Sequence, residues 1–110
     1  MEQTLLVMTN LPDMQSAQLM ARALVEARLA ACVNIIGGVH AIYRWQGQIE
    51  EAQEVTLQIK TTQNRFSQLQ KAILVAHPYE LPEIISLKID QGNASYLHWI
   101  EQQTEPEEHE

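Results

Sequence analysis

The chain has 110 residues, of which 14 are acidic and 7 are basic, and its formal net charge at pH 7 is −7. This length suits one compact domain rather than two. The basic residues occur singly and form no stripe, which argues against nucleic acid or a membrane surface as a partner. The single cysteine excludes an internal disulfide.

The N-terminal residues have no basic segment, and their apolar run is short. Thr4–Thr9 therefore predicts a buried strand rather than part of a signal peptide, and we expect the protein to be cytoplasmic. No apolar stretch approaches the ~20 residues that are needed to cross a bilayer.

The next elements predicted are a helix and a long hairpin. Apolar residues at three- and four-residue spacing predict an amphipathic helix over Asp13–Arg28, with Asp13 as its N-cap. Leu29–Trp45 is rich in β-branched and aromatic residues and predicts one long strand, bent by a bulge at Gly37-Gly38. Gln46-Gly47 supplies a tight turn. Alternation over Gln48–Thr61 then predicts a third strand with one polar and one apolar face.

The second half of the chain predicts a helix, a strand and a short helix. Asn64 is the expected cap of the first of these helices. Ile84–Ile89 is the expected fourth strand, and the spacing of apolar residues over Tyr96–Ile100 predicts the last helix. We therefore expect a single domain over residues 1–103, followed by a disordered acidic tail over residues 104–110.

This order of elements predicts an α+β fold of the ferredoxin-like βαββαβ type with an added C-terminal helix. Right-handed crossovers would place the two main helices on one face of the sheet. Both hairpin strands exceed a dozen residues, whereas about five or six is usual. A hairpin of that length extends beyond a small core and exposes apolar edges. We therefore expect it to dock on other copies of the chain in a closed homo-oligomer.

The segment His77–Glu83 contains two prolines, which stiffen the backbone around an imidazole, a phenol and two carboxylates. His77, Tyr79, Glu80 and Glu83 are therefore candidates for the rim of a binding pocket. The alternative is that this segment only ends a helix and begins a strand, with its polar groups facing water.

Cys32 and His77 are the candidate metal ligands. Thiolate suits Cu(I), whereas imidazole suits Cu(II), zinc and nickel. Neither residue belongs to a ligand-spaced pair, so a site would have to be assembled in space or between subunits. The alternative for Cys32 is a small buried residue with an inert thiol.

The hairpin supplies further candidates for a cleft. A two-residue turn at Gln46-Gly47 would place Tyr43 opposite Glu50. Aromatic walls with carboxylates suit a hydrated metal ion, a cationic group or a small polar metabolite. The alternatives are a solvated strand face for the glutamates and subunit packing for the aromatic residues. The predicted cleft residues of the hairpin are Tyr43, Trp45, Glu50, Glu54 and Lys60.

The sequence resembles the CutA family of divalent-cation tolerance proteins, because six landmarks of that family occur in order along nearly the whole chain. They are Leu29–Ile35, Tyr43–Glu50, Glu54, Lys60–Thr62, His77–Glu83 and Tyr96–Ile100. The resemblance implies a ferredoxin-like fold assembled as a homotrimer with clefts between the subunits. It also implies a role in tolerance of copper and other divalent metals.

Three functions remain open at this point. The first is a cytoplasmic trimer that binds copper or other divalent ions and takes part in the response to metal ions. The second is a sensor similar to PII signalling proteins, which binds a small metabolite between subunits. The third is a scaffold for a protein partner. We expect no enzymatic activity and no required cofactor, since Cys32 lies within an apolar strand without an oxyanion-binding turn.

Overall fold

Seven elements follow one another in the predicted order in the computed structural model, which describes residues 2–106. The α+β fold combines a four-stranded antiparallel sheet with three helices. The elements are β1 (Thr4–Leu11), α1 (Met14–Glu26), β2 (Cys32–Trp45), β3 (Gln48–Thr62), α2 (Gln63–Ala76), β4 (Ile85–Lys88) and α3 (Ala94–Gln103).

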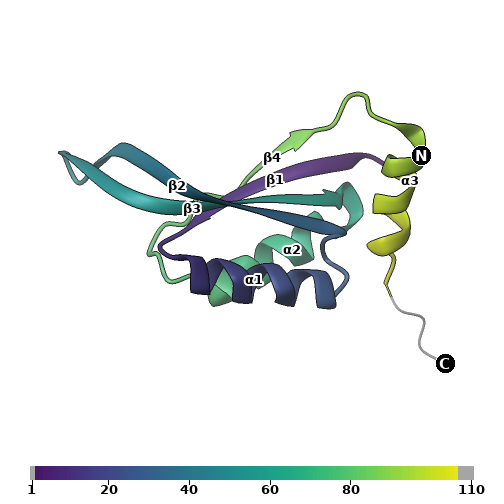
Figure 1. Cartoon of the computed structure of the whole chain (residues 1–110), viewed down its shortest axis with the longest axis horizontal. Helices are drawn as coiled ribbons and strands as arrows, with labels where there is room; N and C mark the ends of the chain where they lie inside the picture. The colour runs from purple at the N-terminus through teal and green to yellow at the C-terminus, as the bar shows by residue number, and fades with distance from the viewer. Residues whose placement is uncertain (1, 107–110) are drawn as a thin grey trace.

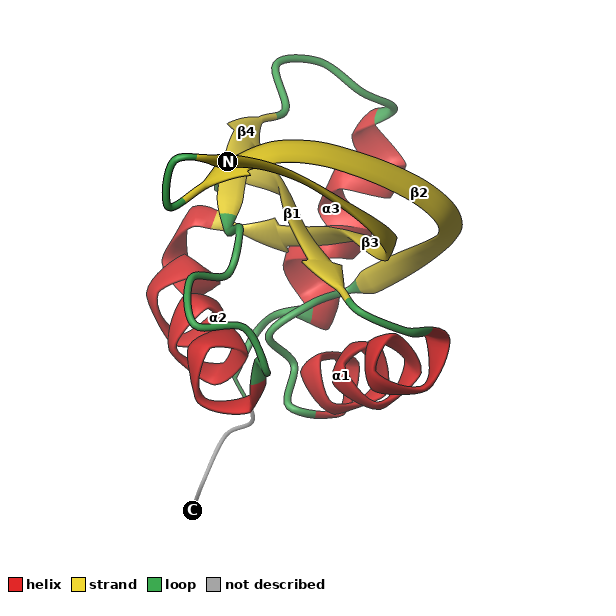
Figure 2. Cartoon of the chain, turned by 90° about the vertical axis from the view of Figure 1, so that its left-hand side faces the viewer, coloured by secondary structure: helices red, strands yellow, loops and turns green. Residues whose placement is uncertain are grey.

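The strands are ordered β2-β3-β1-β4, so that β2 and β4 form the two edges of the sheet. Helices α1 and α2 lie side by side on one face of the sheet, as Figures 1 and 2 show. Helix α3 packs against β3 and β1 at the end of the sheet where β1 begins (Figure 1). The face away from α1 and α2 is called the open face below.

The core lies between the sheet and the helices α1 and α2. Alternate residues of the central strands point into it, as a half-covered antiparallel sheet requires. Helices α1 and α2 add their apolar stripes to the same cluster. Members with no more than 1 % exposure are Leu5, Val7, Leu11, Ala17, Ala30, Leu57, Ile59, Leu69 and Ile73.

The connection from α1 to β2 differs from the prediction. Asp13 caps α1 as expected, with its carboxylate 2.7 Å from the amide nitrogen of Ser16. The helix ends when Arg28 adopts a left-handed conformation with φ of 59°. The amide of Leu29 then donates back to the carbonyl of Leu24 at 3.0 Å. This helix-ending bond explains why β2 begins at Cys32 and not at Leu29, where the β-branched and aromatic pattern had placed it.

The N-terminus of α2 also differs from the prediction. Asn64 is not the cap, because the helix begins at Gln63 and follows Thr62, which makes no side-chain capping bond. Instead, the carboxylate of Glu2 accepts the amide N–H of Asn64 at 3.0 Å. A residue more than sixty positions away thus satisfies one of the free donors of this helix. Such a cap cannot be found from local sequence.

The hairpin of β2 and β3 extends well beyond the rest of the sheet, on the left of Figure 1. Gln46 and Gly47 both have positive φ, 49° and 81°, as a type I′ turn requires. A shift in register between Ile36 and Val39 marks the predicted bulge, in which Gly38 has φ of 75°. The turn and the bulge were both predicted, and together they determine which residues share each face of the hairpin.

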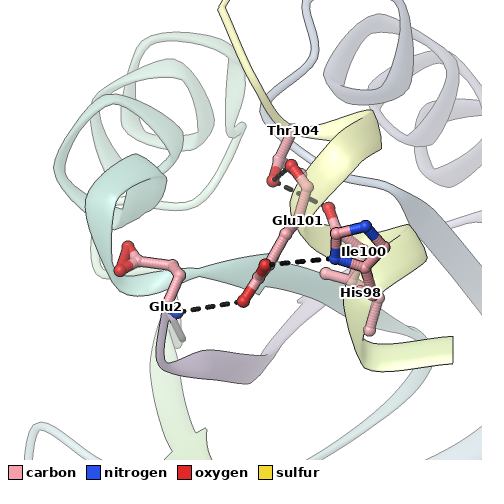
Figure 3. A network of polar contacts seen from close by, with 5 residues as sticks. All are labelled: Glu2, His98, Ile100, Glu101 and Thr104. Carbon is pink, nitrogen blue, oxygen red and sulfur yellow. Dashed lines mark hydrogen bonds and ion pairs between the residues drawn. The ribbon is translucent and has the colours of Figure 1, made fainter. Parts of the chain in front are cut away.

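Helix α3 is tied to the body of the domain near its C-terminal end. Near its C-terminus, the guanidinium of Arg28 donates to the carbonyl of Gln103 at 3.3 Å. The carboxylate of Glu101 accepts the backbone N–H of Glu2 at 2.9 Å and lies 3.6 Å from a ring nitrogen of His98 (Figure 3). Thr104 is buried and donates its hydroxyl to the carbonyl of Ile100 at 2.8 Å. The packed part of the chain therefore includes Thr104.

Of the segment 104–110 that we expected to be disordered, residues 107–110 lie outside the described residues. None of the helices within residues 2–106 has the length and apolar character needed to cross a membrane.

Two buried threonines should respond in opposite ways to replacement by valine. Thr61 donates its hydroxyl to the carbonyl of Leu29 at 2.7 Å, whereas the hydroxyl of Thr9 has no hydrogen-bond partner among residues 2–106. Thr61→Val should lower the free energy of unfolding by about 1–3 kcal/mol, because a buried carbonyl loses its donor. Thr9→Val should raise it by up to about 1 kcal/mol, because an unpaired buried hydroxyl is removed. Urea denaturation at one protein concentration measures both changes. Equal losses in the two variants would contradict this assignment.

Candidate functional site

A cluster of polar side chains lies on the open face, where the hairpin leaves the body of the sheet. The bulge places Val39 opposite Glu54, and the paired residues Asn10 and Thr56 lie next to it. The segment after α2 brings further polar groups to the same point. We call the set the Glu54 cluster, and its members are Asn10, Glu54, Thr56, His77, Tyr79 and Glu83.

His77 is held by two hydrogen bonds to the backbone. Its Nε2 lies 2.7 Å from the carbonyl oxygen of Asn10, and its Nδ1 lies 3.1 Å from the amide nitrogen of Tyr79. Since the carbonyl only accepts and the amide only donates, the ring carries its proton on Nε2. Coordination of a metal by either nitrogen would break one of these bonds.

Tyr79 is bound to Glu54. Its hydroxyl donates to a carboxylate oxygen of Glu54 at 2.8 Å, and its ring lies 4.8 Å from the ring of His77. Burial raises the pKa of Tyr79 well above the usual tyrosine value, and the hydrogen bond and the charge of Glu54 raise it further. Tyr43 and Asp13 contribute smaller electrostatic effects in the same direction. Tyr79 is therefore a neutral hydrogen-bond donor at physiological pH.

The side chain of Asn10 connects the rest of the cluster. Its amide nitrogen lies 3.5 Å from an oxygen of Glu54 and 3.5 Å from an oxygen of Glu83, and its amide oxygen accepts the hydroxyl of Thr56 at 2.6 Å. Two carboxylates from distant parts of the sequence thus converge on one amide. Carboxylate, amide and phenol oxygens at a partly exposed position suit a hydrated cation or a polar ligand.

The thiol of Cys32 lies at the other end of the open face. Cys32 is paired with Lys60, and Lys60 is six residues from Glu54 along β3, which corresponds to roughly 20 Å. Within one chain, Cys32 and His77 are therefore too far apart to bind the same metal ion. Among residues 2–106 there is no group of three or more histidine, cysteine or acidic side chains placed to hold a metal ion.

The other predicted cleft residues divide between the cluster and the outer hairpin. Glu54, Tyr79 and Glu83 belong to the Glu54 cluster with His77, whereas Lys60 is near Cys32. Tyr43 lies opposite Glu50 and Trp45 opposite Gln48, which confirms the predicted register. These hairpin residues lie on the same face as Glu54 but farther from the core, and Glu80 is exposed on the proline segment.

Sequence reasoning missed Asn10 and Thr56. The predicted first strand, Thr4–Thr9, stops before Asn10, and Thr56 is only one residue of the polar face predicted for the third strand. The signal that could have found them is register, because antiparallel pairing of the first and third strands places them opposite each other. That pairing cannot be read from the local pattern of either strand.

A shallow groove of about 650 Å³ lies on the opposite side of the edge strand, between α1 and β2. Leu19 and Arg22 of α1 line it together with Val33 of β2. None of the residues of the Glu54 cluster lines this groove, so the two are separate features.

The family described as "CutA1 divalent ion tolerance protein" matches residues 5–103. The "Divalent-cation tolerance protein CutA" of Thermus thermophilus is 47 % identical over 98 residues, which are 89 % of this chain and 95 % of that protein. The mouse "Protein CutA" is 48 % identical over 94 residues, which are 86 % of this chain but only 53 % of that protein. The chain thus spans about half the length of the mouse relative.

The fold is shared with solved structures of such proteins. A structure from Oryza sativa, titled "Crystal structure of CutA1", superposes with a TM-score of 0.92 at 32 % identity and covers 94 % of this chain and 95 % of that chain. The names of other relatives differ in location, since one is called periplasmic and another chloroplastic. None of the relatives named here has an enzymatic name.

The raised pKa of Tyr79 predicts a titration that depends on Glu54. Alkaline ultraviolet titration of the wild type minus that of Tyr79→Phe isolates the tyrosine concerned. In the wild type it should ionise above the ordinary value of 10.0, and in Glu54→Gln its pKa should fall because the negative charge is gone.

The folded state holds the proton of the Tyr79 hydroxyl more tightly than the unfolded chain does. The resulting stability is therefore fully present below the unfolded pKa and is lost as the pH rises through the folded one. An equal pKa of Tyr79 in the wild type and in Glu54→Gln would contradict the hydrogen bond between Tyr79 and Glu54.

Proposed function

Because the chain belongs to the CutA1 divalent ion tolerance family, we propose that it binds copper or another divalent metal ion as a homotrimer and takes part in the response to metal ions. One observation carries the proposal. The open face carries the thiol of Cys32 at one end and the Glu54 cluster at the other, and solvent-exposed apolar side chains lie between them. Packing of this face between subunits would let donor groups of different subunits approach each other.

The exposed apolar residues support the self-association that a homotrimer requires. Ile36, Ile85 and Leu87 are on the open face, and their exposed fractions are 41 %, 49 % and 53 %. Beyond the core, the hairpin also exposes Ile42 and Ile49 on its other face, at 66 % and 60 %. Exposed apolar area of this kind marks interaction surfaces. Both edges of the sheet have unpaired backbone groups as well, which can pair with another copy.

The proposed metal ligands remain Cys32 and His77, contributed by different subunits. Cys32 is only half-buried and offers a soft sulfur ligand suited to copper. Coordination by His77 would break one of its two backbone hydrogen bonds, so metal binding would be coupled to a local rearrangement of the proline segment. The carboxylates of Glu54 and Glu83 would add negative charge next to it. We also propose a cytoplasmic location for this protein.

A second candidate function is supported by Lys60. Its ammonium group contacts Asn34 and the sulfur of Cys32, and none of the ion pairs among residues 2–106 joins it to a carboxylate. A cation without a carboxylate partner suits an anionic metabolite, as in a PII-like sensor. A thermal-shift screen separates the two functions, since stabilisation by small organic anions and not by metal ions would favour the sensor.

The trimer predicts a specific response to charge on the open face. Light scattering in dilute buffer should return three times the mass of one chain. Leu87→Glu should lower that mass, because it places a charge within the proposed interface. Val75→Glu is the matched control, since Val75 is 85 % exposed on α2, away from the open face. A wild-type mass of one chain, or an unchanged Leu87→Glu, would overturn the assembly.

Metal binding predicts that the affinity for Cu(I), Cu(II) or Zn(II) depends on Cys32 and His77. Calorimetric titration should show at least about tenfold weaker binding in Cys32→Ala and in His77→Gln, equivalent to about 1.4 kcal/mol. All proteins should lack residues 107–110, so that the terminal acidic residues and His109 do not bind the ion. Equal affinities in wild type and both variants would exclude a site built on these ligands.

A further inference from the structure

A thiol and an amine face each other on the first residue pair of the β2–β3 ladder. Cys32 is directly opposite Lys60, and the sulfur lies 3.9 Å from the Nζ of Lys60. Side chains of directly opposed residues share one face of the sheet and are close at their Cβ atoms. The Lys60 amine is also hydrogen-bonded to the amide oxygen of Asn34, two residues along β2 on the same face. The amine is therefore held next to the sulfur.

Tyr96 of α3 interacts with Cys32. Burial raises the pKa of the Tyr96 hydroxyl, and the charge and hydrogen bonding of Cys32 raise it further. Tyr96 in turn stacks on Trp99, with ring centroids 5.5 Å apart. Cys32 itself is half-buried, and its sulfur lies beside the amine of Lys60.

The chain contains no second cysteine. A cysteine oxidised to a sulfenic acid usually condenses with a second thiol, or with a nearby nitrogen to give a sulfenamide. Since no resolving thiol exists within the chain, the amine of Lys60 is the nucleophile already in place. A thiol from another molecule would have to reach a half-buried sulfur, whereas the amine already lies beside it.

We propose that Cys32 and Lys60 are a modification site, at which peroxide converts the pair into a covalent sulfenamide that joins β2 to β3. In the first step hydrogen peroxide oxidises the thiol to a sulfenic acid and is itself reduced, with release of one water. In the second step the ammonium of Lys60 gives one proton to the solvent, and the resulting neutral amine attacks the sulfur, so that a nitrogen–sulfur bond forms and the sulfur–oxygen bond breaks. The hydroxyl leaves with a proton from Nζ as a second water. An added thiol reductant restores both side chains.

The linkage would change the chemistry of this end of the open face. It removes the soft sulfur ligand and the positive charge of Lys60 together, and it ties the two long strands where the hairpin begins. It goes beyond the proposed function, because it needs neither metal nor metabolite. Metal binding could be lost or retained without affecting its test.

The test is peptide mass spectrometry of the assembled protein after treatment with hydrogen peroxide. In the wild type we expect a peptide that contains Cys32 joined to one that contains Lys60, with the sum of their masses reduced by two hydrogens. Trypsin should no longer cleave after Lys60. Both signs should disappear after treatment with a thiol reductant.

Lys60→Arg is the matched control, because arginine keeps the positive charge and the long stem but is a poor nucleophile. In this variant Cys32 should proceed to the sulfinic and sulfonic acids, and it should do so faster than in the wild type. The proposal is overturned if the wild type yields only those acids, or only disulfides between chains. The linked peptide in the wild type decides the question even if Lys60→Arg fails to fold.

Discussion

The pairing register of β2 and β3 is the constraint on which the other features of this molecule depend. A two-residue turn with two positive φ angles fixes the hairpin at one end, and one bulge shifts it near the middle. A slip by one residue would move every side chain of a strand to the opposite face. The register thereby places Cys32 beside Lys60, and Glu54 beside the end of β1. Both polar groupings of the open face follow from it.

Much of the fold could be predicted from the sequence because its signals are local. Gly47 marks the turn, Gly38 the bulge and Asp13 the start of α1, and the structure confirms all three. The errors arose where distant residues intervene. Glu2 caps α2 in place of Asn64, and the left-handed Arg28 delays the start of β2. Helix ends depend on such partners, which a single segment does not contain.

The candidate site was less predictable than the fold, for a related reason. The proline segment indicates His77 and Tyr79 as candidates, and the structure bonds Tyr79 to Glu54. Their connection through Asn10 requires knowledge of strand order, and so does the distance that separates Cys32 from His77 within one chain. The backbone bonds of His77 also give the imidazole a structural task that residue type alone does not reveal. Residue type suggests which side chains could form a site, whereas the order and register of the strands determine which of these side chains lie close together.

The docking of α3 has a practical consequence for work with this protein. Glu2 is bonded to Glu101, and Arg28 holds the carbonyls near the end of α3, so the first and last described segments are neighbours. They lie at the opposite end of the long axis from the hairpin tip (Figure 1). A fluorophore attached to the first described residues or to α3 would therefore lie far from the hairpin tip, so labelling there leaves the tip unmodified.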